Sequence, residues 1–269
     1  MELGFSSLSL FMKSLEEILE IATSDGFDLI EILCEGPYWP RNLLNKDNVE
    51  NNMAVYNPKL KKMDLEIFDS YNIKVMLHCP TIDLNPASMN KGIRTETEKQ
   101  TKETLDLASK IGAIAITTHP GLVHRREERI RNLAIEFAID TLSNCQKYAE
   151  ELGVTFSIEN MPNKPRFLAN TPEEHKFLVE SVGSSATIDW GHANTHENPH
   201  EFLNIPRISY FHLNDNNGEK DSHIPLGEGS ADFSYDFLNN VERGIIELND
   251  YKDVLKSRKY IFKKLKGVR

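Results

Sequence analysis

A polar segment in the last third of the chain contains residues that could bind a metal ion. Residues 211–229 read FHLNDNNGEKDSHIPLGEG, with His212 near the start and Asp221 and His223 further on. Asp221 and His223 are two positions apart, so both side chains point the same way if the segment is extended. Imidazole and carboxylate groups are ordinary ligands of divalent cations. The spacing therefore indicates part of a metal site.

Six further residues of the same types stand at or just after short apolar runs elsewhere in the chain. Four carboxylates brought together would repel one another unless cations neutralised them. A set of five imidazoles and four carboxylates therefore predicts bound cations. These nine candidate ligands are His78, His119, Glu159, Asp189, His192, His212, Asp221, His223 and Glu247.

The size of this set bears on the number of ions. Zinc is satisfied by four or five ligands, and one carboxylate can bridge two ions, so nine candidate ligands predict a cluster of two or three ions. The mixture of imidazole and carboxylate favours Zn²⁺ or Mn²⁺. Cys79, beside His78, is expected to be a small buried hydrophobic side chain. The remaining histidines fall in expected helices or loops and are interpreted as solvated: His124, His175, His196 and His200.

A repeating pattern of apolar runs and amphipathic stretches positions these residues. Helical patterns are clearest at 13–23, 94–111, 127–152 and 251–266. Alternating strands and helices indicate a parallel sheet, and eight repeats in a chain of this length predict a closed (β/α)8 TIM barrel as a single domain over residues 1–269. The apolar runs that would form its strands are 1–7, 27–36, 73–80, 113–121, 154–162, 186–192, 208–215 and 244–250.

In a barrel of this kind the C-terminal ends of the strands form the functional face. The candidate ligands follow the third to the eighth strand, and only the first two strands contribute none. An open doubly wound sheet is the alternative architecture, but no glycine-rich phosphate-binding turn follows the first strand. The sequence therefore predicts a metal site at the C-terminal face of the barrel.

The composition is that of a globular protein with an acidic balance, with 39% hydrophobic residues, 27% charged residues and a net charge of −10. Residues 256–269 carry seven Lys/Arg and no acid, which leaves −17 for residues 1–255. This charge argues against a broad nucleic-acid surface. No apolar run approaches the roughly 18 residues of a membrane span. Because there is no secretory signal and the three cysteines are scattered, we expect a cytoplasmic protein without disulfides.

Several of these motifs together resemble one known family. The stretches LHCP, THPG, IEN, DWGH, FHLND…DSHIPLGEG and IIE, between about residues 73 and 250, resemble the endonuclease IV branch of the xylose-isomerase-like barrel superfamily. Members of that branch bind three zinc ions. The resemblance implies one ion held by His78 and His119, a second by Asp189, His212 and Glu247 with Glu159 bridging both, and a third by His192, Asp221 and His223.

The resemblance also implies hydrolysis of a phosphodiester, in DNA beside an abasic site, by a monomer. Glu159 would position the attacking hydroxide between the first two ions. Two stretches depart from the family: residues 189–196 read DWGHANTH instead of containing an Asp-Thr-Cys-His form, and Thr81 and Ile82 follow LHCP where a side chain that probes the duplex would stand. Candidate substrate contacts at the rim are Tyr38, Trp39, Arg41, Lys164 and Arg166, with Lys91 and Arg94 as further phosphate contacts.

Two other functions remain open at this point. Related sugar isomerases and epimerases keep only the ligands that correspond to Glu159, Asp189, His212 and Glu247, and they bind one ion. In that hypothesis Glu159 and Glu247 would exchange a proton at a carbon beside a carbonyl, and a small sugar would be the substrate. A zinc-stabilised scaffold is a third interpretation, but structural zinc sites are usually closed and rich in cysteine.

Overall fold

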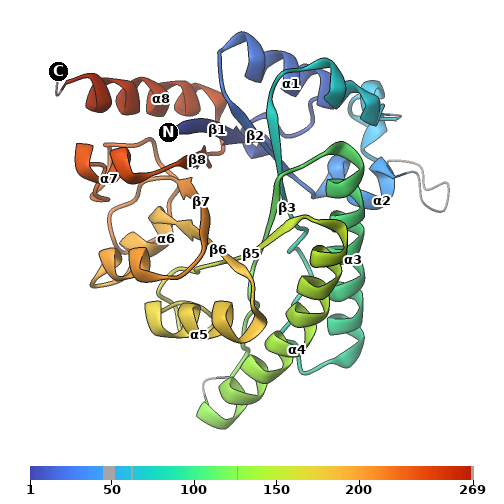
Figure 1. Ribbon diagram of the computed structural model, residues 1–269, viewed down its shortest axis with the longest axis vertical. Coiled ribbons are helices and arrows are strands. Elements are labelled where there is room, and N and C mark those ends of the chain that lie inside the picture. Colours follow the sequence, from blue (N-terminus) through green and yellow to red (C-terminus); the bar gives the residue numbers. More distant parts are fainter. Residues whose placement is uncertain (45–51, 62, 126, 268–269) are drawn as a thin grey trace.

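The computed structural model describes residues 1–44, 52–61, 63–125 and 127–267 (Figure 1). In this part of the chain eight parallel strands form a closed barrel in chain order, and β1 completes it by pairing with β8. The predicted (β/α)8 barrel is confirmed. Its strands are β1 (Glu2–Ser6), β2 (Leu29–Leu33), β3 (Lys74–His78), β4 (Ala115–Thr118), β5 (Thr155–Glu159), β6 (Ser185–Asp189), β7 (Ile208–Leu213) and β8 (Arg243–Ile246).

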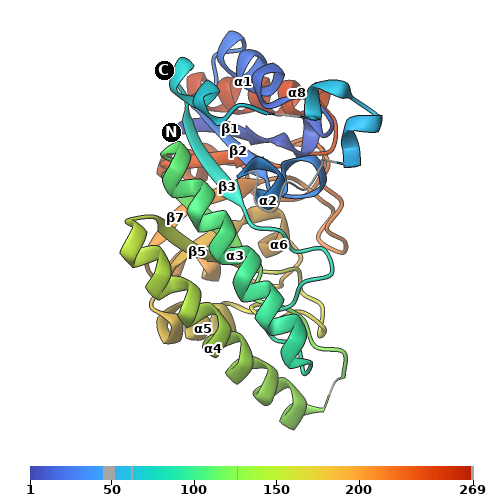
Figure 2. The ribbon, with the colours of Figure 1, turned by 90° about the vertical axis from the view of Figure 1, so that its right-hand side faces the viewer.

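Helices surround the barrel, and the two longest, α3 and α4, pack side by side and extend beyond the rest of the molecule (Figure 2). The α-helices are α1 (Leu15–Ser24), α2 (Pro40–Leu43), α3 (Lys91–Ile111), α4 (Glu128–Leu152), α5 (Pro172–Val182), α6 (Trp190–Asn194), α7 (Tyr235–Asn240) and α8 (Tyr251–Lys266). Short 3-10 helices are η1 (Ser7–Leu10), η2 (Gly36–Tyr38), η4 (Asn52–Val55), η5 (Pro58–Leu60), η6 (Leu65–Ser70) and η7 (Pro199–Asn204).

Local sequence sets where these helices begin and end. Ser14 caps α1 in a reciprocal arrangement with Glu17, because each side chain bonds the backbone N–H of the other residue. The long helices α3 and α4 end at Gly112 and Gly153, whose φ angles are 68° and 67°. A left-handed residue at this position costs little only for glycine. The chain therefore turns back toward the next strand at a defined residue.

The interior of the barrel changes from apolar to polar along the strands. A separate apolar cluster is formed by Leu29, Met76, Ala115, Tyr210 and Ile245. Side chains two positions apart in a strand point to the same side of the sheet. The inward positions that follow these five, toward the C-terminal ends of the strands, are therefore Glu31, His78, Thr117, His212 and Glu247. The apolar layer forms the base on which the polar layer lies.

Two sequence expectations about single residues can be compared directly with the structure. Cys79 is buried and free, as are Cys34 and Cys145, so the expectation of a hydrophobic cysteine without a disulfide is confirmed. The interpretation of His175 as solvated is wrong. Its ring is fully buried on the inner side of α5, and Nε2–H donates to the carbonyl of Ile158 at 2.9 Å. Burial lowers the pKa of His175 to about 4, so it is a neutral core residue.

No helix among the described residues is both long and apolar enough to cross a membrane. The helices that follow β6 and β7 are short, with five residues in α6 and six in α7. Most of the connection from β7 to β8 is therefore a loop, and this loop carries Asp221 and His223.

Candidate metal centre

The structure brings all nine predicted ligands to the C-terminal ends of the strands. His78, Glu159 and Asp189 are the last residues of β3, β5 and β6, and His212 is the last but one of β7. The others follow strands: His119 and Glu247 come directly after β4 and β8, His192 lies in α6, and Asp221 and His223 lie in the loop after β7. Within each of three groups the ligand atoms lie within 4.8 Å of one another. The groups are His78, His119 and Glu159; Glu159, Asp189, His212 and Glu247; and His192, Asp221 and His223.

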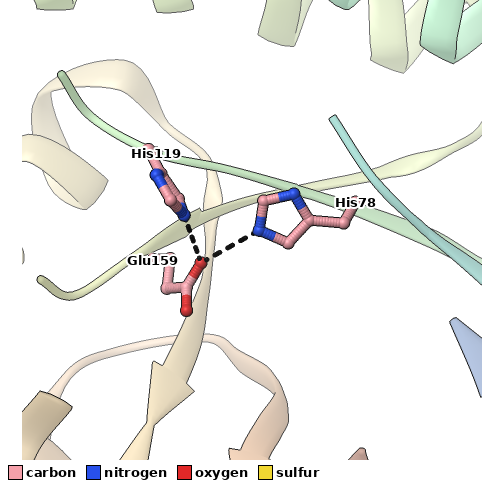
Figure 3. A group of neighbouring side chains, drawn as sticks. All are labelled: His78, His119 and Glu159. Carbon is pink, nitrogen blue, oxygen red and sulfur yellow. Dashed lines mark ion pairs between the residues drawn. The ribbon is translucent and has the colours of Figure 1, made fainter. Parts of the chain in front are cut away.

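The first group surrounds one carboxylate oxygen (Figure 3). Nε2 of His78 and Nε2 of His119 lie 3.4 and 3.3 Å from Oε2 of Glu159. Nδ1 of His78 donates to the carbonyl of Cys79 at 2.8 Å, so Nε2 is the ring nitrogen that faces the group. The side chain of His119 is 30% exposed, whereas His78 and Glu159 are buried. This group is therefore reached by solvent from the side of His119.

The second group shares Glu159 with the first. Nδ1 of His212 lies 2.9 Å from Oε1 of Glu159 and 3.2 Å from Oε2 of Glu247, and Asp189 is 4.0 Å away. The two oxygens of Glu159 thus face different groups. A carboxylate in this position can bridge two cations.

The third group is formed around Asp221 by His192 of α6 and His223 of the loop after β7. Nε2 of His192 and Nε2 of His223 each lie 3.2 Å from its carboxylate. Nδ1 of His192 donates to the carbonyl of Asn160 at 2.8 Å, and Nδ1 of His223 donates to that of Glu247 at 2.9 Å. Both rings therefore present Nε2 to the group, as in the first group.

Backbone contacts explain how this loop is positioned. The buried carboxylate of Asp215 accepts hydrogen bonds from the backbone N–H groups of Gly227, Gly229 and Ala231 at 2.9, 2.9 and 3.0 Å. These bonds fold the segment carrying Asp221 and His223 back over the barrel. The glycines of the GEG motif are needed because Gly227 has φ of 84° and a Cβ at Gly229 would collide with the backbone of Asn216.

The charges in the cluster are close to one another and mostly buried. Burial raises the pKa of the Asp189 carboxyl to about 7. Burial opposes a charge on His78, but the adjacent carboxylate of Glu159 raises the pKa of His78 to about 9.

The donor set fits divalent cations. Oε2 of Glu159 and Oδ1 of Asp221 are buried and accept no hydrogen bond from any described residue, although imidazole nitrogens lie 3.2–3.4 Å away. Buried carboxylate oxygens without hydrogen-bond donors are costly unless a cation satisfies them. The imidazole and carboxylate donors suit Zn²⁺ or Mn²⁺.

One residue of this site was not expected from the sequence. Glu31 of β2 is fully buried, and its Oε2 accepts from Nε2–H of His212 and from the hydroxyl of Tyr210, both at 2.9 Å. Burial works against ionisation of Glu31, but the charge and hydrogen bond of His212 lower its pKa. Glu31 thus fixes the His212 ring with Nδ1 toward the cluster. The available signal was an acid within the apolar run FDLIEIL.

The predicted substrate contacts are placed less uniformly. Tyr38 is a correction: it is fully buried, its hydroxyl donates to the carbonyl of Lys13 at 2.7 Å, and it has no surface for a substrate. The guanidinium of Arg41 bonds Glu103 at 2.8–3.0 Å and is mostly buried, and Nε1–H of Trp39 donates to Gln100 at 2.8 Å. These residues fasten the loop after β2 to α3. Lys164 and Arg166 are exposed on the loop after β5.

Comparisons with known proteins agree with this architecture. The chain is 31% identical to the uncharacterized protein MJ1311 of Methanocaldococcus jannaschii, over 97% of this chain and 88% of that one. A solved D-tagatose 3-epimerase-like protein superposes with a TM-score of 0.81 at 29% identity, over 100% of this chain and 98% of that one. The TTHB071 protein of Thermus thermophilus, soaked with ZnCl2, has a TM-score of 0.74 at 20% identity, with both chains fully covered.

The chain also matches a family model. The model described as "Xylose isomerase-like TIM barrel" matches residues 19–253. The match covers the strands from β2 to β8 and all nine candidate ligands. The endonuclease IV branch within this superfamily stays a prediction. The chain belongs to the xylose isomerase-like TIM barrel family.

Proposed function

We propose that the protein is a metal-dependent phosphodiester hydrolase with an endonuclease IV-like centre, acting on DNA at abasic sites. The observation that carries this proposal is the arrangement of nine candidate ligands in three groups, of which the first and second share Glu159. An enzyme with one ion needs only the second group. It would leave five side chains of the first and third groups without a function: His78, His119, His192, Asp221 and His223.

In this proposal each group has a task. Bound divalent cations would make a water molecule more acidic and offset the charge of a phosphate. Glu159, with one oxygen toward each of two groups, would fix their separation and orient the attacking water. His192, Asp221 and His223 would hold the cation that faces the leaving oxygen. His119 is the most exposed ligand of the first group, so substrate would approach past it.

A single-ion sugar epimerase is the second candidate function, and the comparisons favour it. The similar solved structure at 29% identity is described as a D-tagatose 3-epimerase-like protein. The second group has enough ligands to hold one ion by itself. Carboxylate oxygens of Glu159 and Glu247 lie 2.9 and 3.2 Å from the same nitrogen, Nδ1 of His212. Two carboxylates in this position could take and return a proton at a carbon beside a carbonyl.

Metal content and two assays distinguish the candidates. We expect about three ions per chain by inductively coupled plasma mass spectrometry, and nicking of a duplex with an abasic site. His119→Ala should lower nicking at least about 100-fold. His200→Ala, at an exposed histidine outside the three groups, is the matched control and should have no effect. One ion per chain, with epimerisation of D-tagatose that survives His119→Ala, would establish the epimerase instead.

A further inference from the structure

The loops that follow β4 and β5 are joined into a short two-stranded ribbon. The backbone N–H of Val123 donates to the carbonyl of Arg166 at 2.6 Å, and that of Leu168 donates to Gly121 at 3.1 Å. Leu122 and Phe167 form an antiparallel bridge between these bonds. Each loop begins at a residue of the first ligand group, and the ribbon is therefore continuous with the metal centre.

The ribbon is held in place by a single arginine of α4. The guanidinium of Arg131 donates to the carbonyls of Pro165 and Phe167 at 2.8 and 2.9 Å and to Oδ1 of Asn170 at 2.8 Å. It also pairs with both carboxylate oxygens of Glu174 at 2.9 and 2.7 Å. Five hydrogen bonds from one planar group fix the backbone of the loop after β5.

The loop after β4 is fixed in the same way. Asn85 bonds both backbone groups of Leu122, with Oδ1 accepting from its N–H at 3.1 Å and Nδ2 donating to its carbonyl at 2.9 Å. Both halves of the ribbon therefore have a defined backbone before any ligand binds, which lowers the entropic cost of binding.

The outer face of this ribbon carries a basic hollow of about 410 Å³. No carboxylate of the described residues lines it, although the whole chain has a net charge of −10. Neither Lys164 nor Arg166 forms an ion pair with another described residue, and Arg125 has only a solvent-exposed contact with Glu127 at 3.7 Å. The residues that line the hollow are Val123, His124, Arg125, Lys164, Pro165 and Arg166.

The ribbon links the hollow to the metal centre. A smaller cavity of about 80 Å³ is lined by His119 and by Gly121, Leu122, Met161 and Phe167 of the two loops. Residues of the ribbon thus line one cavity together with the exposed ligand of the first group, and neighbouring residues of the same loops line the basic hollow. A substrate that reaches His119 can extend one of its groups along the ribbon.

We propose that the basic hollow is a phosphate-binding subsite that receives a second phosphate of the substrate, beside the ester at the metal centre. This inference rests on the proposed function, because it assumes a substrate with a further phosphate. Arginine offers paired N–H donors that match phosphate oxygens, and lysine adds a mobile charge. The second phosphate belongs either to a nucleic-acid strand or to a small phosphorylated molecule.

The test removes the charge and keeps the ribbon. The variant combines Arg125→Gln, Lys164→Gln and Arg166→Gln. The ribbon's hydrogen bonds use only the backbone of Lys164 and Arg166, and the one side-chain contact within the ribbon that is lost is that of the Arg166 guanidinium with the ring of Phe167, at 4.7 Å. The matched control combines Lys263→Gln, Lys264→Gln and Lys266→Gln in the last turn of α8, which changes the net charge by the same amount. The zinc-loaded full chain is titrated with a labelled undamaged duplex, which is not cleaved, and separately with ribose 5-phosphate and ribose.

For the duplex, we expect the triple variant to raise Kd at least about 10-fold at 50 mM KCl. The slope of the logarithm of the binding constant against the logarithm of the salt concentration should become less steep by about two to three. The control should leave both unchanged. If only the affinity for ribose 5-phosphate over ribose is lost, the phosphate belongs to a small molecule. Unchanged binding of both probes, equal losses in the control, or no binding by the wild type overturns the proposal. Phosphate binding without nicking would instead overturn the hydrolase and leave the subsite intact.

Discussion

Glu159 is the residue on which the centre depends most, because its two oxygens face two ligand groups. We predict that Glu159→Gln lowers the metal content by at least one ion per chain and the activity at least about 100-fold, since a neutral amide cannot bridge cations. The exposed Glu173→Gln in the first turn of α5 is the control. A full metal complement in Glu159→Gln would contradict the bridging role.

Glu31 acts on the centre through His212. Replacing a carboxylate that orients a metal-binding histidine typically weakens the metal about 10- to 100-fold. We therefore predict that Glu31→Gln weakens one ion by roughly 10-fold, and that Tyr210→Phe, which removes only a donor to Glu31, has a smaller effect. Competition with a chromophoric chelator measures this. Equal affinities in wild type and Glu31→Gln would leave Glu31 with a structural role only.

Residue types at strand ends predicted which side chains come together, because a barrel forces those ends to one face. Glu31 was not predicted as a site residue because it lies inside an apolar strand. Its importance depends on a contact with His212, 181 positions away. The burial of Tyr38 and the pairing of Arg41 with Glu103 could not be foreseen for the same reason. Their partners, Lys13 and Glu103, lie 25 and 62 positions away, and nothing in the local sequence reports those contacts.

At the scale of elements, the loop after β7 depends on Asp215. Replacing this carboxylate leaves several backbone N–H groups without an acceptor, at a cost of about 3 kcal/mol. We predict that Asp215→Ala lowers the free energy of unfolding by about this amount and also removes the cation held by Asp221 and His223. Urea unfolding and metal analysis measure the two effects.

Asp221→Ala separates the effect of the loop on stability from its effect on cation binding. It removes a ligand from the same loop but keeps the bonds to Asp215, so it should lose one ion with a much smaller loss of stability in the metal-free protein. If both variants lost the same free energy of unfolding, the hydrogen bonds of Asp215 would not explain the instability of Asp215→Ala.

The long helices were predictable because extended amphipathic patterns and glycine stops define them: residues 94–111, 127–152 and 251–266 correspond to α3, α4 and α8. The helices α6 and α7 are too short, at five and six residues, to show an amphipathic pattern in the sequence. The ribbon between the loops after β4 and β5 could not be predicted from local sequence either, because Arg131 bonds the backbone of Pro165 and Phe167, which lie 34 and 36 positions away.

At the scale of the whole molecule, the basic end of the chain lies away from the metal centre. The last turn of α8, with Lys263, Lys264 and Lys266, lies at the left of Figure 2, beside the N-terminus, and the loops after the strands lie at the right. These lysines are therefore a suitable control for the cations of the basic hollow, which lie on those loops.

The stability of the whole molecule should depend on pH through His175. The unfolded chain binds a proton at this histidine below its ordinary pKa of 6.5, but the folded chain does so only below about 4. Protons therefore favour the unfolded state in this window, and stability falls as the pH decreases from 6.5 to 4, by up to about 3 kcal/mol. We predict that His175→Gln removes this part of the pH dependence, as measured by urea unfolding at several pH values. Parallel curves for both proteins would contradict it.

The pairing of β1 with β8 joins the first and last strands of the sheet, with Glu2 to Phe5 beside Arg243 to Ile246. Glu247 follows β8 directly and donates its backbone N–H to Leu213 of β7 at 3.1 Å, so the pairing of β8 with β7 completes the second ligand group. During synthesis on a ribosome, neither this pairing nor the closure of the ring can occur until nearly the whole polypeptide has emerged. We therefore expect the capture of a cation at this group to be a late event in maturation. In refolding experiments capture should follow the pairing of β8 with β7, and capture before that pairing would contradict this order.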